Sequence, residues 1–183
     1  MLTAASINAK AVATHREKQQ TEYTVSSAAQ VVADKLAGGM IEWSYDGIGT
    51  DGVPSIKSDT LSDLMTRIWI GTSNNYKEIW TATRENSKTY DFTASKGGGS
   101  AITISSGRAA IVDVYAFVHI DRDMNITVDL STDSDQRTYR TAAYCLTVTA
   151  QCVPHYDTKG KLLSCSWESA TIAKTSSSAG GSS

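Results

Sequence analysis

The chain has 183 residues, of which 40% are hydrophobic and 20% charged, and its 17 basic and 19 acidic side chains give a net charge of −2. This length predicts one domain, or one domain with an appendage, and allows a sizeable core. The charge balance argues against a strongly basic, sequence-specific nucleic-acid binder. Ser (23 residues) and Thr (22 residues) make up about a quarter of the chain, which is typical of solvated β-sheet faces and hydroxyl-rich loops.

Neither the start of the chain nor its apolar segments predict a membrane location. The segment Met1–Ile7 lacks the basic and apolar regions of a signal peptide. No apolar run approaches the roughly 20 residues that span a bilayer. We therefore expect a protein that is made in a cytoplasm and has no membrane partner.

The first zone, residues 1–39, is predicted to be a helical arm. One helix face carries the apolar residues Val25, Ala29, Val32 and Leu36. Residues 14–22 contain good helix formers but no apolar stripe, so they have nothing to pack on their own core. We expect residues 24–37 to form a helix that packs on the domain, and residues 8–22 to leave it and contact another chain.

Residues 40–95 mix several short elements. In chain order the pattern predicts a strand over Met40–Tyr45, a glycine-rich turn over Asp46–Gly52, a short helix capped by Ser58 or Asp59, and two strands over Lys77–Thr83 and Lys88–Thr93. One side of the short helix is apolar and carries Leu61, Leu64, Met65 and Ile68.

Residues 100–174 have the clearest β pattern. Period-two alternation over 112–120, 124–130 and 144–152 predicts long antiparallel strands, and a last strand begins near Leu163. The residues predicted to be buried are Val114, Val118, Ile126, Val128, Leu146 and Val148. The opposite face keeps several apolar residues, namely Tyr115, Phe117, Tyr139 and Cys145, which is more than a monomer's solvent face needs.

These patterns predict a mainly β fold: an antiparallel β-sandwich or barrel with an N-terminal helix or arm and one short additional helix. The domain boundaries that follow are an N-terminal helical arm over 1–39, a β-sandwich domain over 40–174 and a flexible tail over 175–183. The tail is composed almost entirely of Ser and Gly, with one Thr and one Ala, and cannot bury an apolar surface.

Three cysteines, Cys145, Cys152 and Cys165, are an odd number without CxxC spacing, so a disulfide framework or zinc knuckle is not expected. We interpret them as small buried side chains. A cross-strand bridge between Cys152 and Cys165 is the alternative.

Several residue groups offer ligand chemistry, but each also suits a turn. The pairs His119–Asp121 and His155–Asp157 place two possible metal ligands on one strand face, yet both lie where strands give way to turns, which favour Asp. A glycine-rich loop carries three carboxylates that could bind calcium, Asp46, Asp51 and Asp59, but their spacing is not that of an EF-hand. We expect turn roles, no metal and no cofactor.

No arrangement of residues predicts catalysis. The glycine run Lys96–Ser100 precedes a strand and does not fit a phosphate-binding loop. The serines do not form a Gly-x-Ser-x-Gly elbow. Four tryptophans, Trp43, Trp69, Trp80 and Trp167, could line a sugar-binding cleft, although core packing is the default for such residues. We therefore expect that the protein is not an enzyme.

A start without a signal peptide, a helical arm, a Thr/Ser-rich β body and a Gly/Ser tail together resemble the general plan of virion structural proteins of tailed bacteriophages. The resemblance implies a tail-tube, head–tail joining or head-decoration subunit that resides in the virion after synthesis in the host cytoplasm. Its partners would be copies of itself and other virion structural proteins.

The contact residues expected for such assembly lie on the arm and on the outer sheet face: His15, Arg16, Lys18, Tyr23, Tyr115 and Phe117. The alternative hypothesis is a carbohydrate-binding or adhesive β-sandwich module that stacks sugars on exposed tryptophans and tyrosines.

Overall fold

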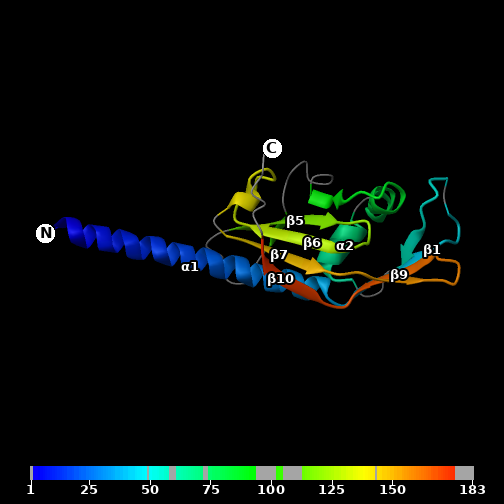
Figure 1. The fold of residues 1–183 in the computed structure, drawn as a ribbon, viewed down its shortest axis with the longest axis horizontal. Coiled ribbons are helices and arrows are strands. Elements are labelled where there is room, and N and C mark those ends of the chain that lie inside the picture. The colour runs from blue at the N-terminus through cyan, green and yellow to red at the C-terminus, as the bar shows by residue number, and fades with distance from the viewer. Residues whose placement is uncertain are drawn as a thin grey trace, which may run out of the picture.

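The computed structural model describes residues 2–48, 50–57, 61–71, 74–93, 102–104, 113–142 and 144–175. This part of the chain combines a long N-terminal helix with two antiparallel sheets, one of six strands and one of four (Figure 1). Helix and strand occur in similar amounts. The expectation of a mainly β protein is therefore wrong, and the fold is mixed α/β.

The larger sheet has the strand order β10-β7-β6-β5-β3, with β4 also paired to β5. Its strands are β3 (Tyr90–Asp91), β4 (Ile102–Ile104), β5 (Val114–Ile120), β6 (Ile126–Ser131), β7 (Cys145–Ala150) and β10 (Ala170–Lys174). The register pairs Val118 with Val128 and Val128 with Val148, so the apolar residues of three strands form one continuous surface. The burial predicted for this surface is confirmed at Val114, Val118, Ile126, Val128, Leu146 and Val148.

Helix α1 (Leu2–Leu36) covers that apolar surface with its C-terminal part. It contacts β5, β6, β7 and β10. The predicted packing face is confirmed, because no side-chain surface remains exposed at Val25, Ala29, Val32 and Leu36. The inner face of the six-stranded sheet is thus closed by a helix.

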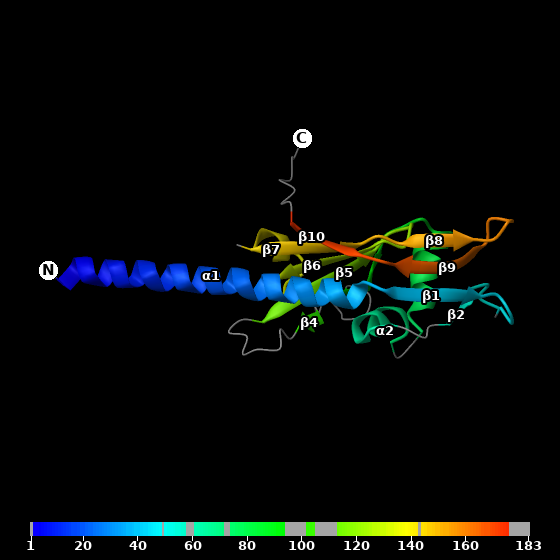
Figure 2. The same cartoon turned by 90° about the horizontal axis from the view of Figure 1, so that it is seen from below.

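The smaller sheet has the order β2-β1-β9-β8 and is formed by β1 (Gly39–Ser44), β2 (Ser55–Lys57), β8 (Val153–Tyr156) and β9 (Leu162–Trp167). It lies end to end with the larger sheet, as two perpendicular views show (Figures 1 and 2). Among the described strands neither sheet closes into a barrel. The expected face-to-face sandwich is replaced by two sheets placed along one long axis.

One long β-hairpin joins the two sheets. Only two residues separate β7 from β8, and two separate β9 from β10, and the pairing passes from Ala150↔Ala170 in one sheet to Val153↔Ser166 in the other. The turn after β5 is bonded to both strands at this crossing. The Cys152 N–H donates to Asn125 Oδ1 at 2.9 Å, and Trp167 Nε1 donates to the Met124 carbonyl at 2.9 Å.

The short helix predicted after the glycine-rich turn is confirmed, with a different cap. Helix α2 (Asp63–Trp69) is capped by Ser62, whose Oγ accepts the Met65 N–H and donates to the Lys35 carbonyl at the end of α1. The caps expected at Ser58 or Asp59 lie outside the described residues. The predicted burial of its apolar side is confirmed for Leu64, Met65 and Ile68.

The strand predicted over 77–83 is wrong. This segment forms helix α3 (Tyr76–Trp80) followed by the π-helical turn η1 (Thr81–Glu85). Its buried residues Tyr76, Ile79 and Thr83 follow helical spacing, whereas the alternation of Ile79, Thr81 and Thr83 resembles a strand. Of the second predicted strand, over 88–93, only Tyr90–Asp91 pairs in a sheet. The tail expected at 175–183 lies outside the described residues except for Thr175.

Replacing Val128 by Asp is expected to lower the free energy of unfolding by several kcal/mol, because the change places an unpaired carboxylate in the centre of the larger sheet. Urea denaturation followed by circular dichroism measures the effect. The matched control is Thr171→Asp on the exposed edge strand β10, for which a loss of about 1 kcal/mol or less is expected. A Val128→Asp protein as stable as this control would contradict the assigned core.

Candidate functional site

The first candidate site is the part of α1 that projects from the body. Figure 1 shows the N-terminal half of this helix extending beyond the described part of the body. The side chains of residues 9–20 are all exposed, and Tyr23 retains 73% exposure. At 1.5 Å per residue, residues 2–23 extend over about 30 Å. The prediction that residues 8–22 leave the domain is confirmed for residues 9–20, whereas Thr21 and Glu22 are half-buried, and the expected contact with another chain stays a prediction.

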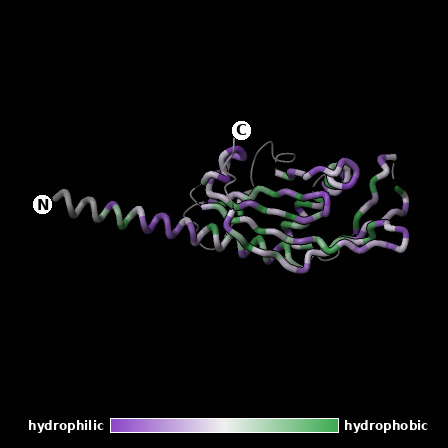
Figure 3. Tube along the Cα trace, in the orientation of Figure 1, coloured by the Kyte–Doolittle hydropathy of each residue, from purple (hydrophilic) through white to green (hydrophobic). Residues whose placement is uncertain are grey.

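The projecting helix has two chemically different parts. Residues 2–13 include eight apolar residues among twelve, with Lys10 as the one charged residue, whereas residues 14–22 are polar throughout. The hydropathy colouring shows the change to a hydrophilic stretch along the helix (Figure 3). The exposed Val12, at 53%, belongs to the apolar part. A polar segment, residues 14–22, therefore separates an apolar tip, residues 2–13, from the body.

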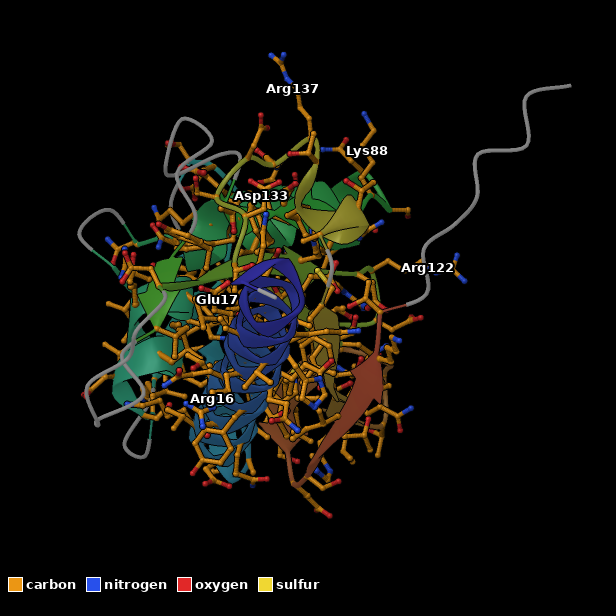
Figure 4. All side chains as sticks on the ribbon, turned by 90° about the vertical axis from the view of Figure 1, so that its left-hand side faces the viewer. Arg16, Glu17, Lys88, Arg122, Asp133 and Arg137 are labelled. Atoms are coloured by element: carbon orange, nitrogen blue, oxygen red, sulfur yellow. The ribbon has the colours of Figure 1, made fainter. Side chains whose placement is uncertain are left out.

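The side-chain hydrogen bonds of the polar segment run to backbone carbonyls one turn earlier in the same helix. Thr14 Oγ1 donates to the Lys10 carbonyl at 3.0 Å, and Thr21 Oγ1 donates to the Glu17 carbonyl at 2.9 Å. Figure 4, seen from the N-terminal end, shows Arg16 and Glu17 on the helix. His15, Arg16 and Lys18, which were predicted as contact residues, are exposed here. Such bonds preserve the helix but do not supply tertiary packing.

The second predicted contact surface, the outer face of the larger sheet, is covered by the chain itself. Segment 132–142, which connects β6 toward β7 and contains the 3-10 turn η2 (Tyr139–Thr141), folds over this face. Phe117 is fully buried, and its ring stacks on Tyr139 with centroids 3.9 Å apart and planes at 11°. Tyr115 is half-buried against the same cluster. The expectation that Phe117 is exposed for assembly is therefore wrong.

The same covered face holds a buried carboxylate that the sequence reasoning missed. Asp129 lies on β6, is 3% exposed and pairs across the sheet with Phe117 and Thr147. Its oxygens accept hydrogen bonds from Tyr139 Oη at 2.8 Å, from Arg140 Nη2 at 2.9 Å and from Thr147 Oγ1 at 2.7 Å. The only sequence signal was a charge at a strand position whose neighbours are apolar.

A wider polar network surrounds Tyr139. The Tyr139 hydroxyl accepts from Arg140 Nε at 2.9 Å and lies 3.3 Å from His119 Nε2. His119 Nδ1 in turn lies 3.6 Å from Asp91 Oδ2, to which Gln136 Nε2 donates. Segment 132–142 is thus bonded to the sheet by side chains from four strands, since Cys145 on β7 also donates to the Tyr139 carbonyl.

The hydrogen bonds around Tyr139 are better suited to holding segment 132–142 on the larger sheet than to acid–base chemistry. Burial, followed by the neighbouring Asp129 charge, raises the pKa of Tyr139 well above its usual value, so the hydroxyl keeps its proton and donates. The negative charge of Asp129 is balanced by Arg140, whose side chain is half exposed. All these interactions fix the covering segment on Phe117.

The aspartates of the two candidate metal pairs serve turns, as the turn interpretation predicts, whereas His119 lies on β5 and His155 on β8. Asp121 Oδ1 accepts from the N–H groups of Asp123 and Asn125, and Asp157 Oδ1 accepts from those of Lys159 and Lys161. The two turns belong to different sheets. In the described ranges no group of three or more His, Cys, Asp or Glu side chains could hold a metal ion.

The structure describes two of the three possible calcium ligands, Asp46 and Asp51. Asp51 pairs with Lys77 at 2.7 Å, and this hydrogen bond, together with one from the Val53 N–H, lowers the pKa of Asp51. Asp46 is exposed, and Asp59 lies outside the described residues. Asp51 therefore already has a cationic partner.

The tryptophans form a core cluster, which is the packing role expected by default. Trp69 and Trp167 are fully buried, Trp43 is 4% exposed, and the Trp43 and Trp80 ring centroids lie 4.7 Å apart. Trp80 is partly buried against the same core. The exposed tryptophan platform required by the adhesive-module hypothesis is not formed by these residues.

Comparison with known proteins identifies no relative. The chain matches no protein-family model, no curated protein and no solved structure. Within the described residues, the helices are too short or too polar to traverse a lipid bilayer. Function must accordingly be inferred from the geometry of the chain itself.

Replacing Tyr139 by Phe is expected to lower the free energy of unfolding at about pH 7 by about 1–3 kcal/mol, because a hydrogen bond to a buried carboxylate is lost. The folded-state pKa of Tyr139 lies above its unfolded value of about 10. The stability contributed by the protonated hydroxyl is therefore complete below that pH and declines as pH rises beyond it.

The difference in unfolding free energy between wild type and Tyr139→Phe should accordingly narrow above about pH 10. Urea titrations on both sides of that pH measure this. Tyr115→Phe, on the same sheet face but outside the Asp129 hydrogen bonds, is the matched control and should change stability less. A gap of constant size across the pH range would contradict the role assigned to the Tyr139 hydroxyl.

Proposed function

We propose that this protein is a virion structural subunit that assembles with copies of itself or with other virion structural proteins through the projecting part of α1. The observation that carries the proposal is the exposure of residues 9–20 on a helix whose other end is built into the core. Its partner would be a surface that accepts an apolar helix tip. In this role the protein is made in the host cytoplasm and resides in the virion.

The energetics of the exposed helix support an interface role. Isolated helices shorter than about 12–15 residues are marginal in water, and most helices in proteins gain their stability from packing an apolar face. The projecting part is anchored only where α1 enters the core near Thr24 and Val25. Docking against a neighbouring subunit would supply the missing packing and bury Val12 with the apolar tip.

The class of subunit is supported by the division of the molecule into a body and an arm. The body has a helix-covered sheet, an outer face fixed by its own segment 132–142 and a tryptophan-rich core. The arm presents contact chemistry at a distance from that body. A stable body with a protruding contact element suits a component of a tube, collar or shell, in agreement with the resemblance to phage virion proteins.

Deleting residues 1–23 is expected to leave a folded body that no longer assembles, because the cut removes the exposed helix and keeps the first buried residues, Thr24 and Val25. Circular dichroism and urea denaturation test folding, and sedimentation velocity tests assembly. Negatively stained images of the intact protein should show rings, tubes or shells. A truncated protein that forms the complete assembly, or an intact protein that stays monomeric at high concentration and binds a glycan instead, would refute the proposal.

Two point variants test whether the arm must be helical in order to assemble, because both keep the arm and only one interrupts its helix. Thr14→Pro interrupts the exposed helix at a cost of about 3 kcal/mol, whereas Thr14→Ala removes the same hydroxyl and preserves the helix. We expect the proline variant to assemble weakly and the alanine variant to assemble like wild type. Equal assembly of the two variants would show that the arm does not act as a continuous helix.

A further inference from the structure

The crossing between the two sheets brings two cysteines together. Cys165 lies on β9 opposite Pro154, and Ser166 lies opposite Val153. Cys152 is two residues before Pro154, so its side chain shares the sheet face of Cys165. Diagonal neighbours of this kind on adjacent antiparallel strands lie about 7–8 Å apart, with their Cβ atoms closer, and Cys152 packs against the core cluster to which Cys165 belongs.

The two thiols do interact. A hydrogen bond between them raises the pKa of Cys152 and lowers the pKa of Cys165. Both cysteines are free, Cys165 is fully buried, and Cys152 is partly exposed. The backbone of Cys152 is fixed by its hydrogen bond to Asn125. One thiol is thus accessible to a small reagent, and its partner is held behind it.

We propose that Cys152 and Cys165 form a redox-active dithiol that closes to an intramolecular disulfide on reaction with a small disulfide such as oxidised glutathione. This inference concerns the crossing between the sheets and is independent of the role of α1. It assigns to this pair the bridge that sequence spacing left as an alternative to simple burial.

The reaction is a balanced exchange in two steps. Cys165, the thiol with the lowered pKa, loses its proton to solvent and then accepts the proton of Cys152 as the Cys152 sulfur attacks oxidised glutathione, forming a mixed disulfide and releasing one glutathione thiolate. The released thiolate takes that proton from Cys165, whose sulfur attacks Cys152 Sγ, forms the protein disulfide and releases the second glutathione, which is protonated from solvent. The protein loses two protons and two electrons, and one glutathione disulfide is reduced to two thiols.

Cys145 provides a matched control because it is a third free thiol that cannot take part. It is buried on β7 and donates to the Tyr139 carbonyl at 2.8 Å. It precedes Cys152 by seven residues on the same run of chain, a separation of about 20 Å, whereas disulfides require Cα atoms within about 7 Å.

The test incubates full-length reduced protein with oxidised glutathione, then counts thiols after unfolding and measures the intact mass. Of the three thiols of the wild type, one should remain, with a mass loss of two hydrogens. Cys145→Ser should retain none and show the same mass loss. Cys152→Ser should keep both of its thiols, and Cys165→Ser should gain one glutathione at Cys152.

Wild-type protein that keeps three thiols, or that carries glutathione without closing the bridge, would overturn the proposal. So would a Cys145→Ser protein that keeps both thiols. If Cys165→Ser does not fold, the comparison of Cys145→Ser with Cys152→Ser still decides between closure and no closure.

Urea denaturation of the two redox forms gives a second readout. The oxidised form of Cys145→Ser should have the higher midpoint, because a bond from 152 to 165 restricts the unfolded chain. The difference should disappear on reduction. A lower midpoint for the oxidised form would show that the native geometry does not accommodate the bond, and would also overturn the proposal.

Discussion

The packing of the last three turns of α1 on the six-stranded sheet is the interaction on which the rest of the structure depends. The sheet presents a continuous apolar surface that includes Val118, Val128 and Val148, and the helix is what closes it. Burial of each large apolar side chain contributes roughly 1.5–3 kcal/mol. Because α1 continues without a break to Leu2, the same packing also fixes the direction in which the exposed part of the helix leaves the body.

The second constraint is the long hairpin that belongs to both sheets. The smaller sheet packs through Trp43 and Trp167 on α2 and α3, and it is also tied to the larger sheet by its strand connections. These connections meet at Cys152 and Trp167, where the turn containing Met124 and Asn125 bonds to both strands. A change at this crossing affects the alignment of the two sheets more directly than a change elsewhere in the hairpin. The interacting thiols lie at this point, so the disulfide proposed above would stiffen the place where the sheets join.

The elements that sequence predicts well are those whose pattern is local. Period-two alternation identifies β5, β6 and β7, and the helix face of Val25 and Val32 is visible in the spacing of apolar residues. The strand prediction at 77–83 is wrong because β-branched residues alternate there. The segment forms a helix instead, since helical spacing allows Tyr76 and Ile79 to be buried together. The covering of Phe117 could not be predicted, since segment 132–142 has no periodic pattern and its attachment depends on long-range bonds to Asp129.

The covering of the outer sheet face changes which surfaces are left for contacts. With Phe117 under its own chain, exposed apolar residues include Val12 and Tyr23 on the arm, Val153, Tyr156 and Leu163 on the smaller sheet, and Ile172 on the edge strand β10. The arm tip and the smaller sheet lie at opposite ends of the long axis (Figures 1 and 2). In the assembly proposed above, a subunit with a helix at one end and a sheet at the other would be polar, and contacts between these unlike ends would be heterologous. Such contacts close into rings where the rotation between neighbours closes, and otherwise continue as helical tubes or filaments. For the assembly proposed above, this placement of exposed apolar residues therefore favours repeated, directional contacts over a symmetric pair of like faces.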